Sequence, residues 1–111
     1  MYTPTDTVTD LAELRKLLGE VPVTQAAKAI DHIDKHCRKW IERSPFIVMS
    51  SANAAGDIDV SPKGDPAGFV KVLDAHTIAV PDRPGNRRVD TMHNLIENPQ
   101  LGLLFVIPNR G

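Results

Sequence analysis

The fold is decided by residues 46–80, which read FIVMSSANAAGDIDVSPKGDPAGFVKVLDAHTIAV. Short apolar or alternating runs in this stretch are separated by glycine, asparagine and aspartate, which is the pattern of strands joined by tight turns. The strands predicted on this basis are residues 46–51, 58–60, 69–73 and 77–80. Because strands joined by short turns pair in an antiparallel way, we expect an antiparallel sheet, most simply a small barrel that closes its own edges.

Helices are predicted on the N-terminal side of these strands. Apolar residues recur every three or four positions over residues 8–18, and Asp6 or Thr7 can cap the start of that helix. The same spacing continues over residues 23–43. This second helix is expected to end there, because the residue before Pro45 is pushed out of the α region.

The chain after position 80 adds a third helix and a last strand. The pattern predicts a short helix over residues 87–97 and an apolar strand over residues 101–107. The apolar residues of that helix expected to face inward are Val89, Met92, Leu95 and Ile96. The predicted class is mainly β with flanking helices, that is, α+β.

The composition is that of one globular domain. The chain has 111 residues, of which 41% are hydrophobic and 24% charged, and this length leaves little room for a second independent core. We predict a single domain over residues 1–111, with a helical part at 1–44 and barrel strands at 45–111. The turn residues Pro108-Asn109 favour a returning strand, so the sequence leaves open that the chain is a fragment whose C-terminal strands are missing.

Charge, cysteine content and hydropathy limit the cellular compartments and the binding partners that can be expected. The formal net charge of −1 argues against a general nucleic-acid binder. No apolar run is long enough for a membrane span, and a single cysteine excludes an internal disulfide, so a reducing cytoplasm is expected. His32 and His36 have a spacing that could hold a metal, but two ligands do not make a zinc site, and no metal is predicted.

An arginine-rich segment lies at the start of the helix predicted over residues 87–97. Asn86 is a suitable N-cap, Arg87 and Arg88 fall in the first turn, and Arg83 lies just before it. A helix N-terminus carries partial positive charge, so cations there are unfavourable unless an anion lies among them. Phosphate is the anion most often bound in this way. The alternative is that the guanidinium groups extend into water or pair with nearby carboxylates.

Residues 61–68, SPKGDPAG, are predicted to form a loop that could approach a ligand closely. The glycines allow close approach of the backbone, the prolines stiffen the loop, and Lys63 supplies a positive charge. Next to an arginine-rich helix start, such a loop would hold a flat phosphorylated ligand. The alternative is a plain connection between two strands.

Several short motifs together resemble one known family. They are Ser61-Pro62-Lys63-Gly64-Asp65-Pro66, Gly68-Phe69-Val70, Pro81-Asp82-Arg83-Pro84-Gly85-Asn86-Arg87-Arg88, Asn94-Leu95-Ile96-x-Asn98-Pro99 and Gly102-Leu103-Leu104-Phe105. Their combination, over about residues 25–108, is similar to the pyridoxamine 5'-phosphate oxidase-related family of FMN-binding proteins. Each motif is short, and it is the combination that is specific.

This resemblance implies a fold, a cofactor and a set of binding residues. The implied fold is the FMN-binding split β-barrel, usually a homodimer with FMN sites at the subunit interface. In the family, the first loop flanks the isoalloxazine ring and the ribityl chain, and the segment after the next hairpin contacts the ribityl and the phosphate. The FMN-binding residues implied in this sequence are Ser61, Pro62, Lys63, Gly64, Val80, Pro81, Asp82, Arg83, Asn86, Arg87 and Arg88.

The resulting functional hypothesis is an FMN-binding flavoprotein, an oxidoreductase on an unassigned small molecule, which forms a cytoplasmic homodimer. A non-enzymatic module that carries or senses flavin, haem or another phosphorylated ligand would use the same residues. A small nucleic-acid-binding barrel is a third hypothesis, disfavoured by the near-neutral charge and by the lack of stacking aromatics on the strands. The sequence assigns no substrate, electron donor or catalytic residue.

Overall fold

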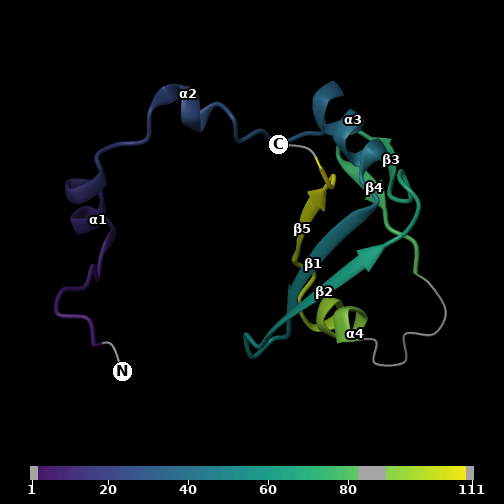
Figure 1. Cartoon of the computed structure of the whole chain (residues 1–111). Coiled ribbons are helices and arrows are strands. Elements are labelled where there is room, and N and C mark those ends of the chain that lie inside the picture. Colours follow the sequence, from purple (N-terminus) through teal and green to yellow (C-terminus); the bar gives the residue numbers. More distant parts are fainter. Residues whose placement is uncertain (1–2, 83–89, 110–111) are drawn as a thin grey trace. The chain divides into compact units, whose positions relative to one another are not determined.

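The computed structural model describes residues 3–82 and 90–109, and the chain divides into two compact units (Figure 1). The first unit comprises residues 1–31 and the second comprises residues 32–111. All strands among the described residues belong to the second unit. Compactness of this kind is not evidence of independent folding, so the predicted single domain stays a prediction.

The first unit contains two short helices, α1 (Leu11–Leu18) and α2 (Val23–Ala26). α1 begins later than predicted, because the carboxylate of Asp10 accepts the N–H of Glu13 at 2.7 Å and so replaces the caps expected further upstream. Gly19 ends the helix, with a φ of 79° in the left-handed region that favours glycine. Neither helix has a buried residue.

The continuous helix predicted over residues 23–43 is wrong, because the structure has α2 and then a separate helix, α3 (Lys35–Arg43). Asp34 starts α3, since its carboxylate accepts a backbone N–H of the first turn at 2.8 Å. The N–H of Ile33 donates to the carbonyl of Ala75 at 2.7 Å instead of bonding within a helix. A local cap and a hydrogen bond to a distant turn therefore outweigh the apolar period.

The second unit contains two antiparallel sheets (Figure 1). β1 (Phe46–Ala52) lies between β2 (Ile58–Gly64) and β5 (Leu101–Val106) in a three-stranded sheet, and β3 (Lys71–Asp74) pairs with β4 (Thr77–Ala79). The predicted α+β class with antiparallel pairing is confirmed. The described residues do not form a closed barrel, so the split barrel stays a prediction.

β2 is longer than predicted, and its length corrects the loop expected over residues 61–68. Its residues pair one to one with β1, from Ile58 opposite Ala52 to Gly64 opposite Phe46. Pro62 is tolerated because β2 has a strand neighbour on one side only among the described residues, and an edge strand can turn a missing N–H outward. The connecting loop therefore begins after Gly64.

The core of the second unit is small. Its buried hydrophobic side chains are Ile41, Ile47, Met49 and Val70. β1 supplies two of them, because its side chains alternate between a buried and a half-buried face. β3 starts at Lys71, two residues later than predicted. Val70, just before it, packs into the core and is only 2% exposed.

Two polar side chains fasten β5 to the rest of the second unit. The hydroxyl of Ser44 lies 2.7 Å from the carbonyl oxygen of Phe46 and 2.8 Å from that of Val106, so its single proton is shared between neighbouring strands. The indole Nε1–H of Trp40 donates to the carbonyl oxygen of Phe105 at 3.0 Å. α3 and the residue that follows it thus hold the C-terminal end of β5 in place.

A buried polar pair holds helix α4 (Asp90–Glu97) against β1. The amide of Asn94 donates to the hydroxyl of Ser51 at 3.0 Å, and the two residues are 7% and 4% exposed. Either residue without the other would be a buried polar group with no partner, which is costly, so the orientation of α4 that pairs them is favoured. This hydrogen bond therefore fixes which face of α4 points to the sheet.

The inward face predicted for this helix is correct only in part. Of the four apolar residues expected there, Leu95 is half-buried, Met92 and Ile96 are exposed, and Val89 lies outside the described residues. Ile96 is 85% exposed, since Asn94 occupies the buried position of α4. A polar residue at the centre of the packed face is a feature that apolar periodicity does not detect.

Candidate ligand-binding site

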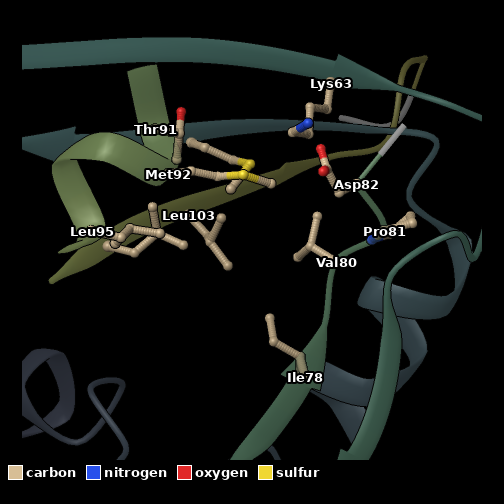
Figure 2. Close-up of a pocket in the computed structure, with 11 residues that line it drawn as sticks. Lys63, Ile78, Val80, Pro81, Asp82, Thr91, Met92, Leu95 and Leu103 are labelled. Carbon is tan, nitrogen blue, oxygen red and sulfur yellow. The ribbon is translucent and has the colours of Figure 1, made fainter. Parts of the chain in front are cut away.

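A pocket lies between the three-stranded sheet, the end of β4 and α4, and Figure 2 shows its lining. Its volume is about 310 Å³, at the lower end of the range for small-molecule sites. Apolar side chains from β1, β4, β5 and α4 form most of the wall. The pocket is therefore suited to the apolar part of a small ligand.

Three polar side chains interrupt this apolar wall. They are Lys63 from β2, Asp82 from the segment after β4, and Thr91 from the first turn of α4. Lys63 is half-buried and Asp82 is exposed, and Figure 2 shows both at one end of the pocket, with Leu95 at the other. A ligand with an apolar ring and one polar edge would meet opposite charges at a single end.

A second, more open hollow lies beside the first one. Its volume is about 490 Å³, and it is lined by the loop Asp65–Phe69, by Lys71 and by the end of β4. The ammonium group of Lys71 donates to the carbonyl of Gly68 at 2.7 Å and so steadies this loop. Val80 and Pro81 line both hollows, so the end of β4 has a depression on either side.

The structure brings together four of the residues implied by the resemblance. Lys63, Val80, Pro81 and Asp82 line one pocket, although they come from two segments of the sequence. Ser61 is half-buried opposite Met49 and does not line this pocket, and Pro62 and Gly64 are exposed on the neighbouring positions of β2. The remaining implied residues lie outside the described part of the chain: Arg83, Asn86, Arg87 and Arg88.

Seven further lining residues were not predicted as site residues: Met49, Ile78, Thr91, Met92, Leu95, Leu101 and Leu103. Most are ordinary apolar residues of strands or helices, whose type gives no functional signal. The sequence held one usable signal: Leu101 and Leu103 are two positions apart in a predicted strand, so their side chains were expected on the same face of the sheet. Thr91 could have been found as the first uncharged polar side chain after the arginine-rich segment.

Two carboxyl groups outside the pocket have a lowered pKa. The pKa of Asp34 lies below its ordinary value because its carboxylate accepts the backbone N–H of Cys37. The pKa of Asp74 is lowered in the same way by the N–H of His76, which it accepts at 2.8 Å in the β3–β4 turn. Both shifts reflect local backbone structure, a helix cap and a tight turn, and neither group lines the pocket.

The lining fits the flat, amphipathic ring of a flavin in its chemistry. Apolar walls suit the ring, and Lys63 and Asp82 supply one donor and one acceptor group at its edge. Asp82 and Thr91 stand on either side of the arginine-rich segment in the sequence, and both line the pocket. Described residues from both sides of the segment expected to hold the phosphate therefore line this pocket.

Residues 3–82 and 90–109 contain neither a membrane-spanning helix nor a cluster of metal ligands. No helix in this part of the chain is long and apolar enough to cross a bilayer. The same residues contain no group of three or more histidine, cysteine, aspartate or glutamate side chains placed to hold a metal ion.

Comparison with known protein families gives a match over most of the second unit. A family model described as pyridoxamine 5'-phosphate oxidase matches residues 33–110, a range that contains both hollows and every residue implied for FMN binding. No curated protein and no solved structure matches the chain at a significant level.

Proposed function

Because the chain belongs to the pyridoxamine 5'-phosphate oxidase family, we propose that it binds FMN beside Lys63 and acts as a flavin-dependent oxidoreductase on a small molecule. One observation carries this proposal. The fold brings Lys63 of β2 to Val80, Pro81 and Asp82, which belong to the second of the two segments implied in flavin binding. Two segments that are distant in the sequence thus meet at one pocket.

In this proposal the flavin ring occupies the region where β2 faces the end of β4. The apolar wall contributed by β5 and α4 takes the ring out of water, and this burial favours binding roughly in proportion to the apolar area covered. Lys63 lies at the polar end of the pocket. Its positive charge near the ring would stabilise a reduced, anionic flavin relative to the oxidised form.

We assign the phosphate to the arginine-rich segment because of its sequence and because residues on both sides of it line the pocket. Arg87 and Arg88, with Asn86, provide charged and neutral donors, and Arg83 contributes less. Asp82 precedes this segment in the sequence, Thr91 follows it, and both line the pocket. We therefore propose that these arginines bind the phosphate of a ligand whose ring lies in the pocket.

The bound flavin would supply the hydride or electron transfer, and the protein would supply binding and electrostatics. Lys63 sets the charge near the ring, and the apolar side chains of the pocket exclude water. No side chain is assigned as a general acid or base. The protein is further proposed to be a cytoplasmic homodimer, as members of the family often are.

The phosphate assignment predicts that replacing Arg87 and Arg88 together with alanine abolishes FMN retention. Two charge-assisted hydrogen bonds would be lost, which corresponds to roughly 100-fold weaker binding or more. Quenching of flavin fluorescence measures the affinity, and thermal unfolding checks that the fold is kept. The double variant Arg38→Ala, Arg43→Ala removes the same charge from exposed positions of α3 and should bind FMN within about threefold of the wild type.

Three outcomes separate the possible failures. A wild-type protein that ignores added FMN in native mass spectrometry contradicts the proposed function itself. Wild-type binding that persists undiminished in the Arg87, Arg88 variant contradicts only the phosphate assignment. Bound FMN that no nicotinamide or deazaflavin donor reduces would contradict the oxidoreductase and favour a module that carries or senses flavin.

A further inference from the structure

Two methionine side chains line the pocket of Figure 2, and they differ in their access to solvent. The chain has three methionines, of which Met1 lies outside the described residues. Met49 comes from β1 and Met92 from α4. Met49 is 7% exposed, whereas Met92 is 44% exposed. A small reagent in solution can therefore reach Met92 while Met49 is shielded within the core.

Two hydrogen bonds hold the helix that carries Met92. One is the buried bond from the amide of Asn94 to the hydroxyl of Ser51. In the other, a carboxylate oxygen of Glu97 accepts the backbone N–H of Ala54, in the turn after β1, at 3.1 Å. The helix cannot turn Met92 away from the pocket without breaking these bonds. A chemical change in the Met92 side chain therefore stays at the pocket wall.

The chemistry open to an accessible methionine is oxidation by a peroxide. The sulfur attacks one peroxide oxygen, an S–O bond forms as the O–O bond breaks, and the second oxygen leaves as water. The sulfur gives up two electrons, and the peroxide is reduced. The product, methionine sulfoxide, is polar where the thioether was apolar. At Met92 this reaction would place a hydrogen-bond acceptor in an otherwise apolar part of the wall.

Donors for such an acceptor are present in the same pocket. Lys63 and Thr91 both line it, and an ammonium or a hydroxyl group can donate to a sulfoxide oxygen. Figure 2 shows the side chains of Met92 and Lys63 extending into this pocket. An apolar ring that entered the oxidised pocket would take the sulfoxide out of water, which is unfavourable. A ligand that needs Lys63 would also compete with the sulfoxide for that donor.

We propose that Met92 is an oxidation site through which peroxide controls ligand binding in this pocket. Oxidation of Met92 to the sulfoxide weakens the binding of a flat apolar ring, and a ring that is bound first shields the sulfur from peroxide. Reduction of the sulfoxide restores the pocket, because reductases reverse this modification. The inference rests on the proposed function, since FMN is the ligand with which it is tested.

Peptide mapping by mass spectrometry tests the site of oxidation. In wild-type protein exposed to dilute hydrogen peroxide without FMN, we expect Met92 to gain one oxygen atom at least about 10-fold faster than Met49. With saturating FMN present, we expect the oxidation of Met92 to slow at least about 10-fold. Equal rates at the two methionines, or a rate at Met92 that FMN leaves unchanged, would overturn the inference.

The effect on binding is tested with Met92→Leu, which keeps an apolar side chain of similar volume and removes the sulfur. Each protein is treated with peroxide, freed of it with catalase, and compared with its own untreated form by quenching of flavin fluorescence. We expect the FMN affinity of the wild type to fall at least about 10-fold and that of Met92→Leu to change less than about threefold. Methionine sulfoxide reductases should restore the affinity of the oxidised wild type. Because the variant keeps Met49 and Cys37, the comparison separates oxidation of Met92 from oxidation elsewhere.

The outcomes distinguish this inference from the function on which it rests. An untreated wild type that does not bind FMN overturns the proposed function and the role of Met92 with it. A wild type that binds FMN and keeps its affinity after Met92 has been oxidised overturns the role of Met92 alone. An equal loss of affinity in treated wild type and treated Met92→Leu assigns the effect to another residue and likewise leaves the proposed function standing without this inference.

Discussion

Gly68 is a residue whose backbone conformation and surroundings both require glycine. Its φ is +81°, and a Cβ built on it would lie 2.9 Å from the carbonyl oxygen of Glu42. Its N–H donates to the carbonyl of Ser44 at 3.3 Å, so the loop after β2 is packed directly onto the end of α3. A side chain at this position would push against backbone, which cannot move aside as the end of a flexible side chain can.

Gly68→Ala is accordingly predicted to lower the free energy of unfolding by about 3 kcal/mol, as the sum of left-handed strain and steric overlap. Gly56→Ala is the matched control, because Gly56 has a φ of +89° with nothing within 4 Å of the added Cβ. It should cost only about 1 kcal/mol, the strain alone. Urea unfolding measures both variants, and equal losses would show that the close approach to Glu42 has no energetic weight.

At the scale of elements, the start of α3 depends on an ionised carboxylate. Asp34 accepts the N–H of Cys37, and this bond holds the pKa of Asp34 below its ordinary value of 3.8. A carboxyl with a lowered folded-state pKa contributes stability that is complete above the unfolded value and is lost as the pH falls through the folded value. The contribution of this cap should therefore be present at neutral pH and disappear below about pH 4.

Comparison of wild type with Asp34→Asn tests this expectation, because asparagine can still accept the bond but does not titrate. The difference in free energy of unfolding between the two proteins should change only below about pH 4, where the wild type loses stability faster. Asp74 titrates in the same direction because its pKa is also lowered, so Asp74→Asn serves as the parallel case for the β3–β4 turn. A difference that stays constant from pH 7 to acid would contradict a titrating cap.

The elements also show how far the sequence could predict this fold. The presence of strands followed from apolar or alternating runs, and their antiparallel pairing followed from the short turns between them. β1, β4 and β5 were predicted well because these signals lie within the strands and turns themselves. The break between α2 and α3 could not be predicted from the apolar period, because it depends on a hydrogen bond from Ile33 to the distant Ala75. β2 was shortened in prediction because Pro62 resembles a loop residue until the strand is known to lie at an edge.

The sequence likewise predicted some residues of the candidate site and missed others. Lys63 stood out because a charged residue among glycines and prolines suggests a ligand, whereas Asp82 was implied only by the family resemblance. Met49 and Leu103 did not stand out, since their contribution to the pocket arises only when two strands pair at a given register. A sequence motif can thus indicate the polar end of a site, but its apolar wall is a product of tertiary structure.

At the scale of the whole molecule, the three-stranded sheet of the second unit has an apolar face that the described residues of that unit leave exposed. Ile58, Val60 and Leu104 are 73%, 61% and 60% exposed. The register places them on one face, opposite that of the buried Ile47 and Met49. Apolar patches of this kind on a sheet are typical of surfaces that associate. We therefore assign the proposed homodimer contact to this face.

The last prediction is that Val60→Lys weakens the dimer. A lysine there would be solvated in the monomer, since Val60 is 61% exposed, but would be buried without a partner in the dimer. We expect the dissociation constant of the dimer to rise at least about 10-fold, with little change in thermal unfolding of the monomer. Sedimentation analysis over a range of concentrations measures this constant.

Val23→Lys, at an 84% exposed position of the first unit, makes the same chemical change away from the sheet and should leave the constant unchanged. A wild type that is monomeric throughout would contradict the homodimer, whereas a dimer that survives Val60→Lys would place its contact on another surface and leave the flavin site unaffected.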